Sequence, residues 1–250
     1  MKAKTFNAQQ IQAIQDGRLV EFREPIKKST ALFDGGPWPN WIDRDEYDWE
    51  AAFVDEGPSP AGNAGPYLKL TYPGVETGAT IHRIYPKLFV GDLIWCRETW
   101  VALRFYRDYE SGVIDDWEPC DPKCVKEEKE GPFDDRPYAF IYRADGHWED
   151  DPPNKGFSWR SPVTMPRCAS RLTLEVISVR CERVQSVNGW NALKAGIDLK
   201  DARAGREVNI DGEYTERYLL SKFRELWQSR HPGSWERNDW VWVYEFKVVE

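Results

Sequence analysis

Apolar residues recur at helical spacing in three stretches of the chain, which predicts helices over residues 7–17, 188–196 and about 213–229. Asn7 is the predicted N-cap of the first helix, and Gly17 can take the left-handed conformation that closes it. The core-facing positions of the last helix are predicted to be Leu219, Phe223 and Leu226. We expect the helices to lie at the margins of the fold.

Five further stretches show the alternation or the short apolar runs that are typical of strands. They cover residues 18–23, 93–100, 138–143, 171–184 and 240–248. Within 171–184 the alternation slips by one residue after Val176, which predicts a bulge or a sharp bend of the kind that small barrels need. Residues 240–248 are apolar on both faces, so we expect a central strand there. Pro25 is expected to end the first strand.

Two long stretches, at about 31–80 and 104–155, are rich in glycine, proline and acidic residues and are interpreted as loop insertions. The first contains isolated aromatic residues, which should pack it onto the rest of the fold. No segment has the composition of a linker between domains. The sequence therefore predicts one α+β domain over residues 1–250, a mixed β-barrel with peripheral helices and two loop insertions.

The composition limits the kind of partner. The chain has 250 residues, a formal net charge of −8 and 13 Trp, 11 Tyr and 11 Phe. A protein that coats duplex DNA needs a basic face, so the acidic excess favours a small ligand, a single base or a protein partner. The first 17 residues have no long apolar run, no stretch could span a bilayer, and the five cysteines form no framework, which together predict a reducing cytoplasm.

Four segments resemble the ASCH-domain proteins that are common in phage and prophage genomes. They are residues 6–23, 91–100, 159–197 and 223–247, and the most specific stretch is Met165–Leu172, with the sequence MPRCASRL. The resemblance implies a PUA-like β-barrel related to readers of RNA modification. For a phage-encoded protein the compartment would be the cytoplasm of the host cell.

Some small ASCH proteins are amidohydrolases that remove the acetyl group from N4-acetylcytidine, with a Lys and a Thr after a Gly-Arg pair and a Glu before a Gly. In this chain Gly17-Arg18 is followed by Leu19 and Phe22 at the Lys and Thr positions, and Ala195 occupies the Glu position. Apolar side chains neither attack an amide nor transfer a proton. The resemblance therefore predicts a barrel that has lost this hydrolysis, in which Phe22 could stack on a base.

We predict a phage-type module that binds a nucleobase, a nucleotide or a short single-stranded nucleic acid, with no cofactor, metal or catalytic residue. The predicted ligand-binding residues are Arg18, Phe22, Arg23, Arg97, Glu98, Trp100, Arg167, Ser170 and Arg171. The arginines form a local positive excess that suits phosphate. Each arginine could equally pair with a glutamate such as Glu98, Glu175 or Glu182.

Two other functions stay open. One is a hydrolase that acts on a modified nucleoside such as N4-acetylcytidine. The other is a phage inhibitor that binds a host defence protein through acidic runs such as 43–50 and 145–151, which would otherwise be solvated loops. Cys120 and Cys124, with His147, supply only part of a zinc site, because structural zinc needs four ligands.

Overall fold

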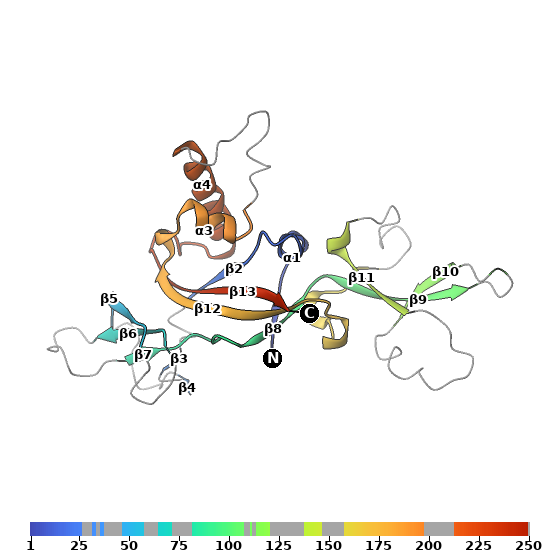
Figure 1. Cartoon of the computed structure of the whole chain (residues 1–250), viewed down its shortest axis with the longest axis horizontal. Helices are drawn as coiled ribbons and strands as arrows, with labels where there is room; N and C mark the ends of the chain where they lie inside the picture. The colour runs from blue at the N-terminus through green and yellow to red at the C-terminus, as the bar shows by residue number, and fades with distance from the viewer. Residues whose placement is uncertain are drawn as a thin grey trace. The chain divides into compact units, whose positions relative to one another are not determined.

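The computed structural model describes residues 1–26, 32–33, 36–37, 47–57, 65–71, 82–107, 111, 114–120, 138–146, 158–197 and 213–249. Over these ranges the chain is a mixed α+β protein, built mostly from strands with few helices (Figure 1). The residues group into two compact units. Unit 1 comprises residues 1–16, 93–174 and 248–250, and unit 2 comprises residues 17–92 and 175–247. Each unit is therefore assembled from several separate segments of the chain.

Unit 1 is built around two groups of strands. Its elements are β1 (Lys2–Thr5), α1 (Ala8–Gln15), β8 (Leu93–Arg97), β9 (Trp100–Arg107), β10 (Ile114–Pro119), β11 (Tyr138–Tyr142) and the 3₁₀ turns η4 (Arg143–Asp145), η6 (Pro162–Thr164) and η7 (Arg167–Ala169). β1 pairs with β8 in parallel, and β9 lies between β10 and β11 in an antiparallel sheet. Side chains from β9, β11, the residue after β10 and the two later turns form a core of Trp100, Ala102, Cys120, Tyr142, Met165 and Ala169.

The predicted first helix is confirmed. The Asn7 side chain accepts a hydrogen bond from the backbone N–H of Gln10 at 2.8 Å, and the Gln10 side chain accepts one from the Asn7 N–H at 3.1 Å. This reciprocal capping box satisfies two donors that a helix start otherwise leaves unpaired. Gly17 follows the helix with φ of +70°, the left-handed conformation that the sequence predicted.

Unit 2 contains a sheet in which β13 lies between β12 and β2, a second sheet in the order β4-β3-β7-β6-β5, and two helices. The elements are β2 (Glu21–Pro25), β3 (Leu32–Phe33), β4 (Gly36–Pro37), β5 (Asp48–Asp55), β6 (Tyr67–Thr71), β7 (His82–Ile84), β12 (Thr173–Arg183, from Glu175 onward in this unit), η8 (Val184–Ser186), α3 (Gly189–Lys194), α4 (Glu213–Arg230) and β13 (Trp240–Val249, up to Lys247 in this unit). Four successive residues of β13, Val241 to Tyr244, are buried. The predicted central strand is thus confirmed.

Helices α3 and α4 pack on β13 through one apolar cluster (Figure 1). The cluster contains Val184, Val187, Ala192, Leu219, Phe223, Trp227, Val241 and Val243. Leu219 and Phe223 face the core as predicted, but the prediction for Leu226 is wrong. Leu226 is exposed, and the next residue, Trp227, is buried in its place. The spacing from Phe223 to Trp227 is four residues, which keeps the larger ring on the buried face.

The strand β12 has the predicted change of phase. Leu174 and Val176 are buried, Ile177 is exposed, and Val179 and Cys181 are buried again. The buried face therefore moves by one position within the strand, as a local bulge or bend would cause.

The interpretation of residues 31–80 as loop is wrong where the structure describes them. The strands β5 and β6 pair in antiparallel fashion, and β6 pairs in turn with β7. In β6, Leu68 and Leu70 are buried and Lys69 lies between them, which is the alternation of a half-buried strand. The surrounding glycines and prolines hid this short pattern. Part of the second insertion is also a strand, because β9 continues to Arg107 and pairs with β10.

Pro25 is the last residue of β2, so the expectation that it ends this strand is confirmed. Its Cα pairs with that of Val241. Because β2 is the outer strand of its sheet, a residue without a backbone N–H costs no ladder hydrogen bond there.

None of the sheets formed by the described residues closes on itself. The α+β class is confirmed, whereas the PUA-like barrel stays a prediction, as does the single domain over residues 1–250.

Candidate ligand pocket

Unit 2 contains a pocket of about 340 Å³ between the turn that follows α1 and the helix α3. It is lined by Gly17, Arg18, Val20, Trp190, Leu193, Lys194 and Ile197. Of these seven residues, only Arg18 was among the predicted ligand-binding residues. The volume is within the range of small-molecule sites, which is about 300–1,000 Å³.

The helix α3 supplies one wall of the pocket because its two faces differ. Trp190, Leu193, Lys194 and Ile197 follow one another at intervals of three, one and three residues, the spacing of a single helical face. The other face carries Gly189 and Ala192, which are buried. Trp190 is exposed at the pocket, whereas Leu193 and Ile197 line the pocket and also pack against the apolar cluster of α3, α4 and β13.

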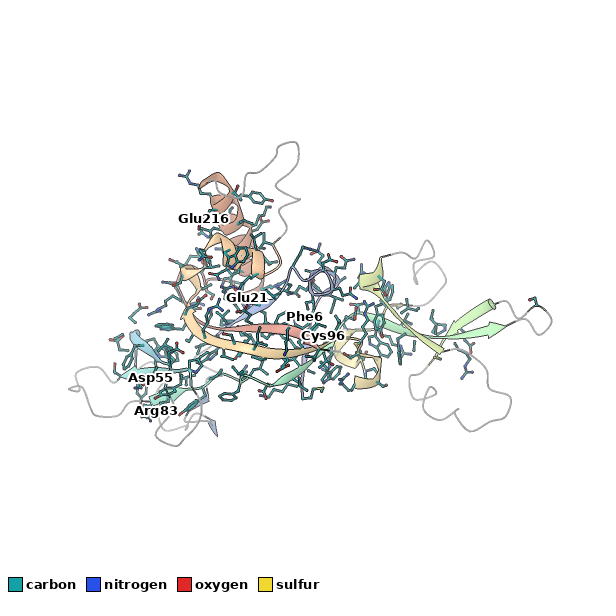
Figure 2. All side chains as sticks on the ribbon, viewed as in Figure 1. Phe6, Glu21, Asp55, Arg83, Cys96 and Glu216 are labelled. Carbon is teal, nitrogen blue, oxygen red and sulfur yellow. The ribbon has the colours of Figure 1, made fainter. Side chains whose placement is uncertain are left out.

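The position of α3 is fixed at both ends. The Asn188 side chain accepts a hydrogen bond from the Asn191 N–H at 2.9 Å, and Gly196 follows the helix with φ of +85°. A Cβ at Gly189 would meet the side chains of Glu216 and Leu219 of α4 at 3.4 and 3.5 Å, so glycine permits the close approach of the two helices. Figure 2 shows Glu216 on α4, beside α3. Trp190 therefore stands on a rigid support.

Trp190 has an unusual exposure for its size, with 66% of its surface accessible. Large aromatic side chains are mostly buried in folded proteins, and an exposed one in a pocket offers a flat apolar surface to a ligand. Val20, Leu193 and Ile197 extend that apolar surface. The wall is suited to a planar ring.

Two of the positions selected by the ASCH resemblance meet beside this pocket. Leu19 and Ala195 form an antiparallel β-bridge, and the Val20 N–H donates to the Lys194 carbonyl at 2.9 Å. Leu19 is 2% exposed, so its side chain is buried. The third position, Phe22, is buried and packs against Tyr244 and Phe246, with ring centroids 5.1 and 5.8 Å away. Phe22 does not line the pocket.

The charged groups of the pocket are Arg18 and Lys194. The Lys194 Nζ lies 2.9 Å from the Glu245 carboxylate on β13, and each of these side chains is about one quarter exposed. Both charged side chains that line the pocket are cationic, and Glu245 is the acidic partner of Lys194. A ligand that carries an anionic group next to a planar ring would match both features.

The predicted binding residue Arg23 has a different environment in unit 2. Its guanidinium contacts Glu21 at 2.5 Å and Glu182 at 3.1 Å, and only 1% of its side chain is exposed. Arg180 contacts the same two carboxylates at 2.8 and 3.2 Å. Glu21, labelled in Figure 2, is fully buried. These alternating charges neutralise one another. Arg23 therefore pairs with glutamates, which was the alternative to ligand binding that the sequence left open.

Glu98 and Arg171 form a buried pair in unit 1. The Arg171 guanidinium donates to both oxygens of Glu98, at 2.9 and 3.0 Å, and to Asp145 at 2.6 Å. It also lies over the Tyr142 ring, 4.1 Å from the centroid. Burial raises the pKa of Glu98, against the opposing effect of Arg171, and burial raises the pKa of Tyr142 to about 12.

The remaining predicted residues also lie in unit 1. Trp100 is fully buried, and its ring contacts Phe140 and Arg160. The Ser170 hydroxyl lies 2.9 Å from the backbone carbonyl oxygen of Cys96. Arg97 and Arg167 lie over the ring of Trp95. The nine predicted residues thus divide between the two units, three in unit 2 and six in unit 1.

The residues described by the structure include no group of three or more His, Cys, Asp or Glu that could hold a metal ion. Cys120 is buried, while Cys124 and His147 lie outside the described residues. So does most of the acidic run 145–151, together with residues 43–46 of the other run. Among the described helices, none has both the length and the apolar character needed to cross a membrane.

No protein-family model, curated protein or solved structure matches the chain. The resemblance to ASCH proteins therefore stays a prediction.

The sequence did contain a signal for the pocket wall that our sequence analysis missed. The sequence predicts a helix over residues 188–196, and the faces of this helix differ. Gly189, Ala192 and Leu193 share one face at helical spacing, and Trp190 falls outside that face. An aromatic residue outside the core-facing stripe indicates a surface that is available for a ligand.

Proposed function

We propose that the protein binds a nucleobase, as a nucleotide or within a short single strand, in the pocket formed by the Gly17-Arg18 turn and α3. The observation that carries this proposal is Trp190, which is 66% exposed on the wall of a pocket of about 340 Å³. Stacking of a base on an aromatic side chain contributes about 1–3 kcal/mol.

The charge of the pocket supports a nucleotide over a neutral ring. Arg18 lies at the pocket beside the apolar wall, and its planar guanidinium can donate two hydrogen bonds to one phosphate. Lys194 would act as a point charge, shared with Glu245. The resemblance to ASCH proteins of phages and prophages, with their relation to RNA-modification readers, favours the same ligand class.

The proposal does not include the amidohydrolase reaction. The three positions that would carry it are Leu19, Phe22 and Ala195, and both Leu19 and Phe22 are buried. We expect no deacetylation of N4-acetylcytidine above the rate in buffer, measured by chromatography of the nucleosides. Formation of cytidine by the purified protein would contradict this and would favour the alternative of a hydrolase.

Calorimetric titration with the four nucleoside 5′-monophosphates tests binding. We expect saturable binding of at least one of them, weakened about 5- to 150-fold in Trp190→Ala, which corresponds to the loss of about 1–3 kcal/mol of stacking. Because Trp190 is largely exposed, this variant should keep the fold and its unfolding midpoint.

Phe53→Ala is the matched control, since Phe53 is another exposed aromatic residue of unit 2 that does not line the pocket. It should bind as tightly as the wild type. Equal affinities for the wild type and Trp190→Ala would reject the pocket as the site.

A further inference from the structure

Unit 1 carries two arginines on a single indole. The guanidinium carbon of Arg97 lies 4.7 Å from the Trp95 ring centroid, and that of Arg167 lies 5.9 Å from it. The two cations can be no farther apart than the sum of these distances. Both side chains are attracted to the ring by its negative face, which restricts their positions before any ligand arrives.

Neither arginine forms an ion pair with a carboxylate in the described part of the chain. Arg97 has the indole as its side-chain contact, and Arg167 donates to the Met1 sulfur at 3.3 Å and to the Thr173 hydroxyl at 3.1 Å. Arg171, in the same unit, instead has two carboxylate partners. In a chain with a net charge of −8, two adjacent arginines without an acidic partner favour an external anion.

The local fold holds these two side chains in place. Arg97 is two residues after Trp95 on β8, so both side chains leave the same face of the strand. Arg167 begins the turn η7, and Ser170 at the end of that turn is tied to β8 by its contact with the Cys96 carbonyl. Cys96, labelled in Figure 2, marks this part of β8.

Three further charged residues lie on the paired strand or next to β8 in the sequence. The strand β1 pairs with β8 so that Lys2 and Lys4 lie opposite Ile94 and Cys96, on the other face from Trp95 and Arg97. The carboxylate nearest in sequence is Glu98, whose side chain is buried and accepts hydrogen bonds from two of the three guanidinium nitrogens of Arg171. We call the surface formed by Trp95, Arg97 and Arg167 the arginine surface.

We propose that the arginine surface binds the phosphodiester backbone of single-stranded nucleic acid. The inference rests on the proposed function for its ligand class, a nucleic acid. Trp95 is only 9% exposed and covered by guanidinium groups, so it offers no face for a base. The surface would therefore contact phosphates without regard to sequence. The planar fork of each arginine matches one phosphate group.

Fluorescence anisotropy of a short, labelled, mixed-sequence oligonucleotide at several salt concentrations tests this proposal. Each phosphate contact on a single strand contributes about 0.7 to the slope of log affinity against log salt. We expect Arg97→Gln combined with Arg167→Gln to reduce the slope by about 1.4, and the exposed Arg167→Gln alone to reduce it by about half as much. The single change alters a surface side chain, so its result does not depend on the folding of the double variant.

Arg237→Gln is the control, because Arg237 is an exposed arginine already paired with Asp239. It should leave the slope unchanged. An unchanged slope in both test variants would overturn the proposal, as would competition by poly-glutamate that is as strong as competition by unlabelled strand, since the surface would then prefer acidic peptides.

Mononucleotide calorimetry on the same variants separates the two proposals. If a mononucleotide binds the wild type and the arginine variants equally, the proposal for the pocket is supported, whatever the salt dependence of oligonucleotide binding shows. If the slope of log affinity against log salt falls as expected but no mononucleotide binds the wild type, the proposal for the arginine surface is supported and the proposal for the pocket is rejected.

Discussion

Replacing Arg171 with methionine is expected to lower the free energy of unfolding by about 3–5 kcal/mol at neutral pH, because it leaves a buried carboxylate without its partner. Glu98 is 1% exposed and receives two hydrogen bonds from Arg171. Methionine fills a similar volume and keeps a contact with Tyr142, so the loss is mainly electrostatic. Urea unfolding followed by tryptophan fluorescence measures the effect.

The pH dependence of this loss has a defined sign. Burial already raises the pKa of Glu98, and Arg171 is the group that lowers it, so the variant should have a still higher folded-state pKa. A carboxyl with a raised folded-state pKa binds its proton more tightly in the folded state, which stabilises the fold at low pH and loses that effect as pH rises. The difference between variant and wild type should therefore shrink as pH falls toward the ordinary Glu value of about 4.3.

A second substitution completes this test. Glu98→Gln removes the charge that Arg171 neutralises, so Arg171→Met should cost much less in that background. Equal costs in the two backgrounds, or a loss below about 0.5 kcal/mol at neutral pH, as is typical of surface changes, would show that the pair does not hold unit 1 together.

Arg23→Met is expected to destabilise the protein by about 3 kcal/mol, the lower end of the range for breaking a buried pair. Glu21 is fully buried and would keep Arg180 as its partner, at 2.8 Å, which limits the loss. The Arg23 guanidinium also lies 5.4 Å from the Phe223 ring centroid, a contact that methionine can partly replace.

Arg224→Met provides the matched control for this change. Arg224 pairs with Glu236, and both side chains are about half exposed, so the substitution should change the free energy of unfolding by less than about 1 kcal/mol. Similar effects of Arg23→Met and Arg224→Met would contradict the structural role of the buried charges. Unchanged mononucleotide binding by Arg23→Met under folding conditions would separate Arg23 from the pocket.

The parts of the fold that sequence predicted well are those with local causes. Asn7 and Gly17 delimit α1 through capping contacts within a few residues, and Asn188 and Gly196 do the same for α3. The residues of β13 are apolar on both faces of the strand, which predicts that both faces are buried. The strand does lie between two others in its sheet. The phase change in β12 could likewise be seen in its own residues.

The parts that sequence did not predict depend on partners that lie far along the chain. Nothing near Glu98 indicates that Arg171 neutralises it, and nothing near Glu21 indicates Arg180. Alternation in β6 covers five residues between stretches rich in glycine and proline, too few to outweigh the flanking residues. Trp190 was overlooked because a tryptophan in a short amphipathic helix is usually a core residue.

The arginines show why residue type alone could not define the binding site. Arg23 and Arg171 form ion pairs with buried carboxylates, whereas Arg97 and Arg167 form cation–π contacts with the indole of Trp95. The sequence is compatible with two roles for each arginine, ligand binding and pairing with a glutamate. Only the three-dimensional arrangement distinguishes an arginine that is already paired from one that is placed to meet an anion.

The most direct test of the proposed site is a two-dimensional NMR titration of the protein labelled with ¹⁵N-tryptophan. The indole N–H groups of the 13 tryptophans give separate probes, and the Trp190→Phe variant assigns the one from the pocket. We predict that a nucleoside monophosphate shifts the Trp190 signal in a saturable way and shifts the buried Trp100 and Trp242 signals little. A Trp190 signal that stays in place while the ligand saturates the protein, or while other indoles move, would contradict the proposed site.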